Sequence, residues 1–94
     1  MNTQFTAKLE EYVHLNYHER MKRNEELFNL AKAAKELQIL YNTFYESGVH
    51  TYEEKILRKL KDVANSKDEW LFIKNHSYDY PHINNFAINK LKSM

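Results

Sequence analysis

The chain has 94 residues, with 14 lysines and arginines against 13 aspartates and glutamates, and no cysteine. This length fits one domain over residues 1–94. The near-neutral charge argues against a protein whose main role is to coat nucleic acid, and the lack of cysteine excludes disulfides and thiolate metal sites. The chain also has one glycine, Gly48, and one proline, Pro81, where average usage would supply roughly six and five. Because hairpins of all-β folds depend on glycine, we predict an all-α protein, a small bundle of four to five helices.

The first apolar residues fall on one helical face, because they recur at spacings of three and four. They are Phe5, Leu9, Tyr12, Val13 and Tyr17. A cap at Thr3 or Thr6 is expected to start this helix. The pattern weakens over residues 16–23, which are polar on nearly every face. Residues 3–46 can therefore form one bent helix or two, and we favour two.

Residues 25–46 show the clearest periodicity and predict a long central helix. Their apolar positions follow an unbroken 3-4-3-4-3 spacing, which is a heptad stripe: Leu27, Leu30, Ala34, Leu37, Tyr41 and Phe44. Gly48 is expected to end this helix in the left-handed conformation. The stripe is interpreted as core, with pairing to a partner chain or to a second copy in a homodimer as the alternative.

Three shorter helices are predicted in the second half, over residues 51–65, 68–75 and 81–94. The first two begin with capping boxes, in which a Thr or Ser is followed three residues later by Glu: Thr51 with Glu54, and Ser66 with Glu69. Pro81 suits the first turn of the last helix, where no N–H is needed. The five helices together are expected to make one helical domain.

The residue pattern predicts neither catalysis nor metal binding. His14 and His18 lie one helical turn apart, but no third ligand follows at a useful spacing, so we interpret them as surface residues. His76 and His82 flank a turn and likewise lack a third partner. Paired glutamates adjacent in sequence point about 100° apart on a helix and do not converge on one site. We therefore expect no enzyme activity, no cofactor and no metal.

Aromatic residues supply the strongest indication of function. They gather around the Gly48 corner and around the turn after residue 75: Tyr41, Tyr45, Tyr52, Trp70, Phe72, Tyr78 and Tyr80. Trp70 and Phe72 point to different helical faces, so one short helix can bury both side chains only if two of its sides are covered. Such a surplus favours a protein partner. We predict a small regulatory or inhibitory protein that binds another protein through these side chains.

A helix-turn-helix transcription regulator over residues 51–94 is the alternative, with residues 81–94 as recognition helix. Asparagine can read adenine, and lysine can contact guanine or phosphate. The nucleic-acid-binding residues would be Lys55, Arg58, Lys59, His82, Asn84, Asn85, Asn89, Lys90 and Lys92. The turn over residues 75–80, however, is longer than usual and lacks glycine. A bundle of the bacteriocin-immunity type is a third alternative, by analogy of size and class alone.

No apolar run approaches the roughly 18–20 residues of a membrane span, and no signal-peptide core follows the first methionine. We therefore predict a cytoplasmic protein without membrane insertion. The pattern leaves open who the partner is and how many copies of the chain associate.

Overall fold

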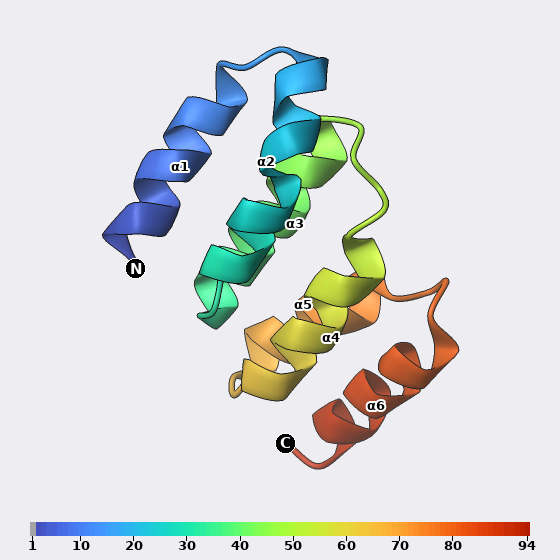
Figure 1. Ribbon diagram of the computed structural model, residues 1–94. Coiled ribbons are helices and arrows are strands. Elements are labelled where there is room, and N and C mark those ends of the chain that lie inside the picture. Colours follow the sequence, from blue (N-terminus) through green and yellow to red (C-terminus); the bar gives the residue numbers. More distant parts are fainter. Residues whose placement is uncertain (1) are drawn as a thin grey trace.

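The computed structural model describes residues 2–94, and this part of the chain contains six α-helices and no strand (Figure 1). The helices are α1 (Thr3–Val13), α2 (Tyr17–Leu30), α3 (Ala34–Glu46), α4 (Glu53–Val63), α5 (Lys67–His76) and α6 (Pro81–Lys92). The all-α prediction is confirmed, but the six helices of the described residues exceed the expected four to five.

The predicted long central helix over residues 25–46 is wrong. The longest helix is α2, with 14 residues, and the chain leaves the helical conformation between Ala31 and Ala33, whose ψ angles are 112° and 152°. The heptad stripe nevertheless stays in the core on both sides of this break, with Leu27 and Leu37 fully buried. The spacing therefore identified the buried face without establishing a continuous helix.

The break between α2 and α3 is stabilised by a buried carboxylate. Glu36 is only 2% exposed. Its Oε1 accepts hydrogen bonds from the backbone N–H groups of Lys32 (3.1 Å) and Ala33 (3.0 Å), and its Oε2 accepts one from Asn2 (2.7 Å). The N–H groups at the start of a helix have no partner within the helix, so Glu36 satisfies them without a glycine or proline at the break.

The charge of Glu36 fits this role. Burial raises the pKa of its carboxyl, but the backbone donors of Ala33, Asn2 and Lys32 lower it by more, so the net pKa lies below the ordinary 4.5. The side chain is consequently ionised at neutral pH. It connects the first residues of α1 to the α2–α3 junction through charge-assisted hydrogen bonds.

Residues 3–46 form three helices, where one bent helix or two were expected, and the second of them, α2, starts at Tyr17. Asn16 caps α2 by accepting a hydrogen bond from the N–H of Glu19 (2.9 Å). The cap of α1 is Asn2, whose side chain accepts from two N–H groups of the first turn. The predicted cap at Thr3 or Thr6 is therefore wrong, because the cap lies one residue before Thr3. Asparagine is at least as good a cap as threonine.

Local signals set most boundaries in the second half of the chain. Gly48 follows α3 with φ of 76°, which confirms the predicted left-handed end. Ser66 and Glu69 form the expected capping box, and Pro81 occupies the first turn of α6.

The capping box predicted at Thr51 is not formed. The cap of α4 is Tyr52, without a side-chain hydrogen bond, and the helix starts at Glu53. Glu54 pairs instead with Arg58 one turn later, with 2.9 Å between Oε2 and Nε. Because the cap is Tyr52 and not Thr51, Glu54 lies at the second position of the helix, one residue short of the position that a capping box uses.

The helices pack as two groups of three, α1–α3 and α4–α6, joined where α3 packs on α4 (Figure 1). Buried side chains from all six helices form one apolar cluster. Within it, the Tyr12 hydroxyl donates to Asn24 Oδ1 (2.8 Å), and its ring lies 5.7 Å from that of Phe44. The molecule measures 42 × 26 × 16 Å.

Within residues 2–94, every helix is too short or too polar to span a lipid bilayer.

Candidate functional site

A pocket of about 380 Å³ lies between α3 and α5, at the junction of the two groups of helices. We call it the Tyr45 pocket, and it is lined by Tyr41, Asn42, Tyr45 and His76. The three α3 residues share one face because side chains three and four positions apart are neighbours on a helix. Tyr41 is 6% exposed and forms the floor, whereas Tyr45 is 61% exposed and forms the rim.

The floor of the Tyr45 pocket is fixed by aromatic packing. The Tyr41 ring lies edge-on to Phe72 (5.5 Å between centroids) and to His76 (5.0 Å). Phe72 and His76 stack on each other at 4.1 Å. His76 Nδ1 lies 2.7 Å from the Phe72 carbonyl oxygen, and because a carbonyl only accepts, this nitrogen carries a proton. The walls are therefore held in place before any ligand arrives.

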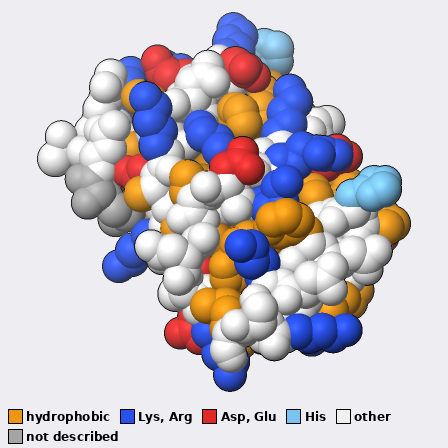
Figure 2. Space-filling model, turned by 90° about the horizontal axis from the view of Figure 1, so that it is seen from below, with side chains coloured by type: hydrophobic (Ala, Val, Ile, Leu, Met, Phe, Trp, Pro, Cys, Tyr) orange, Lys and Arg blue, Asp and Glu red, His pale blue; other side chains and the backbone are white. Residues whose placement is uncertain are grey.

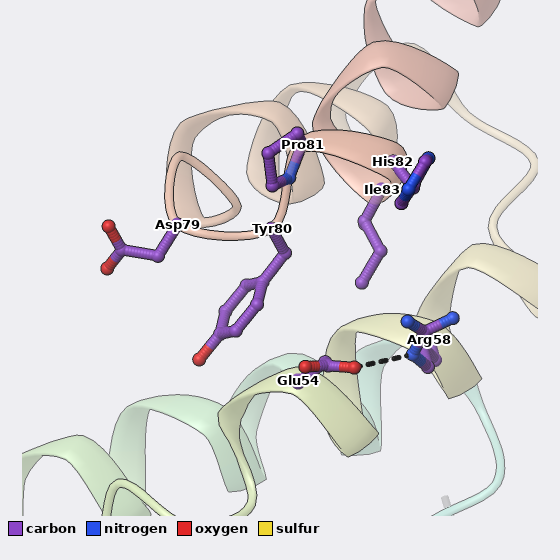
Figure 3. Close-up of a pocket in the computed structure, with 7 residues that line it drawn as sticks. All are labelled: Glu54, Arg58, Asp79, Tyr80, Pro81, His82 and Ile83. Carbon is purple, nitrogen blue, oxygen red and sulfur yellow. Dashed lines mark hydrogen bonds and ion pairs between the residues drawn. The ribbon is translucent and has the colours of Figure 1, made fainter.

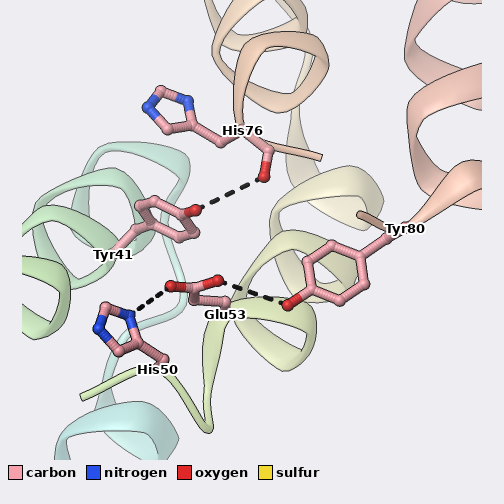
Figure 4. A network of polar contacts seen from close by, with 5 residues as sticks. All are labelled: Tyr41, His50, Glu53, His76 and Tyr80. Carbon is pink, nitrogen blue, oxygen red and sulfur yellow. Dashed lines mark hydrogen bonds and ion pairs between the residues drawn. The ribbon is translucent and has the colours of Figure 1, made fainter. Parts of the chain in front are cut away.

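A polar network extends from the pocket to the start of α4 (Figure 4). The two oxygens of Glu53 contact His50 Nδ1 (2.7 Å) and accept from the Tyr80 hydroxyl (3.4 Å). The Tyr41 hydroxyl donates to the backbone carbonyl of His76 (3.5 Å). The Glu53 side chain is 19% exposed, so its charge is partly shielded from water and acts over a longer range.

The electrostatics of this region are negative. Burial raises the pKa of Tyr41 to about 12, and the negative charge of Glu53 is the next largest cause, followed by contributions from Tyr80, Tyr45 and Asp79. Burial and Glu53 also raise the pKa of Tyr80. In the part of the chain that the structure describes, Glu53 has no lysine or arginine ion-pair partner. Both phenols therefore remain protonated at neutral pH beside the Glu53 carboxylate.

Tyr80 also lines a second, smaller pocket of about 160 Å³ (Figure 3). Its other residues are Glu54, Arg58, Asp79, Pro81, His82 and Ile83. The dashed contact in Figure 3 is the ion pair of Glu54 with Arg58. This ion pair balances two of the charges in the pocket, and Asp79 is the third charged residue that lines it.

The aromatic residues predicted to bind a protein divide into two sets. Four of them, Tyr41, Tyr45, Phe72 and Tyr80, lie in or beside the Tyr45 pocket. The other three lie elsewhere: the Tyr52 hydroxyl donates to Glu25 Oε2 (2.6 Å), Trp70 is 4% exposed, and Tyr78 is 70% exposed in the α5–α6 turn. Burial and the contact with Glu25 raise the pKa of Tyr52 to about 12.

Some residues of the nucleic-acid alternative serve the fold. The Asn84 amide donates to the backbone carbonyl of Lys74 (2.8 Å) and to Ser77 Oγ (3.1 Å). Lys59 Nζ donates to the Phe28 carbonyl oxygen (2.7 Å) and lies 4.6 Å from the centre of its ring. Burial, together with the positive charge of Lys32, lowers the pKa of Lys59. Asn84 and Lys59 are thus engaged inside the protein.

The remaining residues of that alternative are exposed. Those on α6 are His82, Asn85, Asn89, Lys90 and Lys92. The first four share one face of the helix with Phe86, which is 42% exposed, and Lys92 lies beside that face. On α4, Lys55 lies 5.1 Å from the Tyr52 ring and Arg58 pairs with Glu54. In the face seen in Figure 2, Lys and Arg are dispersed among apolar and uncharged groups.

The turn between α5 and α6 is shorter than predicted. It spans residues 77–80, because α5 continues to His76 and α6 starts at Pro81. The Tyr80 N–H donates to the Ser77 carbonyl oxygen (2.9 Å), and Asn84 joins Ser77 from α6. Four residues match the usual helix-turn-helix connection.

Sequence reasoning missed Asn42, His50 and Glu53. Asn42 could have been found, since it shares the helical face of Tyr41 and Tyr45. His50 and Glu53 reach the site only because α4 packs on α3, which no local pattern specifies. Among residues 2–94, no group of three metal-ligating side chains comes together, and the two histidines at 14 and 18 are exposed.

Comparisons of the chain with protein-family models, with curated proteins and with solved structures gave no significant match.

Proposed function

We propose that this chain is a small, non-catalytic regulatory or inhibitory protein that binds another protein through the Tyr45 pocket. The observation that carries the proposal is the exposed Tyr45 ring standing beside a preformed aromatic floor. Tyrosine is enriched in interface centres because it combines a large apolar ring with a polar end. Residues that fill or line such pockets dominate binding energies.

The rigidity of the pocket supports the same proposal. Tyr41 is held by Phe72 and His76, and the Tyr45 ring packs edge-on against His50 with 5.5 Å between centroids. Ordering side chains at an interface weakens association. Rings that are already positioned reduce this loss, so a partner can gain most of the contact energy.

The test is affinity capture from the native host with three tagged baits: the wild type, Tyr45→Ala and Tyr17→Ala. Tyr17 is the matched control, because it is 63% exposed against 61% for Tyr45 and lies at the start of α2. Captured proteins are identified, purified and titrated by calorimetry. We expect Tyr45→Ala to weaken binding by about 30-fold, the effect of a hot-spot residue, and Tyr17→Ala by less than about twofold.

A partner bound equally by all three baits would contradict the proposal. Light scattering of the purified chain distinguishes a second copy of this protein from a different partner. A Tyr45-dependent homodimer would place the interface at the same pocket but remove the regulatory role.

DNA binding by residues 51–94 is the second candidate. It is favoured by the four-residue turn before α6 and by the exposed row of polar residues on that helix. The same captures repeated with and without nuclease test it. A DNA-binding protein would retain nucleic acid only in the untreated sample, and Asn85→Ala and Lys90→Ala would each reduce its affinity by about tenfold.

A further inference from the structure

Three acidic side chains lie near the Tyr45 pocket: Glu46, Glu53 and Asp79. Glu53 and Asp79 are close enough to raise the pKa of the Tyr41 hydroxyl. Glu46 is exposed directly after Tyr45 and one turn beyond Asn42. None of the four described residues that line the pocket is lysine or arginine. An anionic ligand, such as a phosphate group, would therefore be repelled here.

The chemistry of the walls points in the same direction. The faces of tyrosine rings carry partial negative charge and attract ammonium and guanidinium groups, more strongly when water is displaced. Asn42 adds an amide oxygen that can accept a hydrogen bond from such a group. The volume of about 380 Å³ is at the small end of ligand sites, which run from roughly 300 to 1,000 Å³.

We propose that the Tyr45 pocket receives a lysine or arginine side chain of the partner protein, with the cation against the tyrosine rings and near the Glu53 carboxylate. This inference rests on the proposed function, because it specifies the partner's contribution to the same interface. Figure 4 shows Glu53 held by His50 and Tyr80. Its charge is close enough to Tyr41 to raise the pKa of that hydroxyl.

The geometry of Glu53 favours attraction of a cation over an internal role. Its one ion-pair partner in residues 2–94 is His50, a side chain that is itself 58% exposed. In contrast, Glu54, the next residue, is paired with Arg58. A cationic side chain entering the pocket would therefore meet a carboxylate that no permanent positive charge neutralises.

The probe is the peptide acetyl-Gly-Arg-Gly-amide, titrated into the isotope-labelled protein and followed by NMR. The control peptide has citrulline in place of arginine, which keeps the shape and removes the charge. We expect the arginine peptide to shift the signals of residues 41–46 and 76, with a Kd in the millimolar range. The citrulline peptide should bind about fivefold more weakly or less well still, as the loss of a cation–aromatic contact implies.

Two variants locate the effect. Glu53→Gln and Tyr45→Ala should each weaken arginine-peptide binding by about threefold or more. Their matched controls, Glu54→Gln and Tyr17→Ala, should change it by less than about twofold. The NMR spectrum of each variant establishes that it is folded before titration.

Equal binding of the arginine and citrulline peptides would overturn this inference, as would shifts that map outside the Tyr45 pocket or an unchanged spectrum at about 10 mM peptide. Stronger binding of a dinucleotide probe at the pocket would overturn it as well. These failures differ from a failure of the proposed function, which is read from Tyr45-dependent binding of the intact partner. The binding of a partner could depend on Tyr45 but not on Glu53 or on any lysine or arginine of the partner. That result would support the proposed function and overturn the further inference.

Discussion

Glu36 and Glu53 are both glutamates in the first turn of a helix, yet their surroundings differ in kind. Glu36 is 2% exposed and accepts hydrogen bonds from three backbone N–H groups. Glu53 has a 19%-exposed side chain that contacts an exposed histidine and a tyrosine hydroxyl. Glu36 therefore uses its charge to join α1, α2 and α3, whereas Glu53 keeps its charge beside an open pocket. The contrast separates a carboxylate that the fold buries and satisfies with backbone donors from one that we propose attracts a cationic side chain of a partner.

Removing the Glu36 carboxylate should have the largest effect. Glu36→Ala leaves three backbone donors without their charged acceptor and opens space in a buried position. We expect the free energy of unfolding to fall by about 2–4 kcal/mol, as measured by urea denaturation. A loss below about 1 kcal/mol would mean that water replaces the carboxylate at the α2–α3 junction. Glu36 would then not be the carboxylate that stabilises the fold.

Acid should remove the same contribution. Because the folded-state pKa of Glu36 is lowered, its stabilisation is fully present above the ordinary value of 4.5 and is lost as the pH falls through the folded pKa. The difference in unfolding free energy between the wild type and Glu36→Gln should therefore shrink as the pH falls below 4.5. Urea denaturation at a series of pH values measures it. A difference that stays constant or grows toward acid would contradict the sign of this shift.

Gly48→Ala should have a smaller effect, on the corner that leads from the pocket to Glu53. Gly48 has φ of 76°, and no atom lies within 4 Å of the position that a Cβ would occupy. The substitution therefore adds backbone strain without a clash, and we expect a loss of about 1 kcal/mol in thermal denaturation. A loss as large as that of Glu36→Ala would contradict this ranking, because the corner would then contribute as much to stability as the buried carboxylate.

The same comparison explains which parts of the molecule could be predicted from the sequence. Gly48, Pro81 and the Ser66 capping box act through residues next to them in the chain, and all three boundaries are confirmed. The break at Ala31–Ala33 depends on Glu36 reaching back along the chain and across to Asn2, 34 positions away. No local pattern reports such a contact, so the continuous heptad stripe suggested an unbroken helix.

The candidate site was predictable to a similar extent. Tyr41 and Tyr45 were identified because aromatic residues gather around the Gly48 corner and around the turn after residue 75. Tyr52 and Trp70 were named by the same criterion, but they pack against other helices and lie outside the pocket. Glu53 was missed because its role depends on where α4 begins relative to α3, which follows from tertiary packing.

The most direct test of the distinction between the two carboxylates is the free energy of unfolding of Glu53→Ala, measured by urea denaturation beside Glu36→Ala. Loss of an acidic residue from the first turn of α4 should lower it by less than about 1 kcal/mol, well below the loss at Glu36. Equal losses at the two positions would contradict the account, because Glu53 would then be as much a part of the folded framework as Glu36.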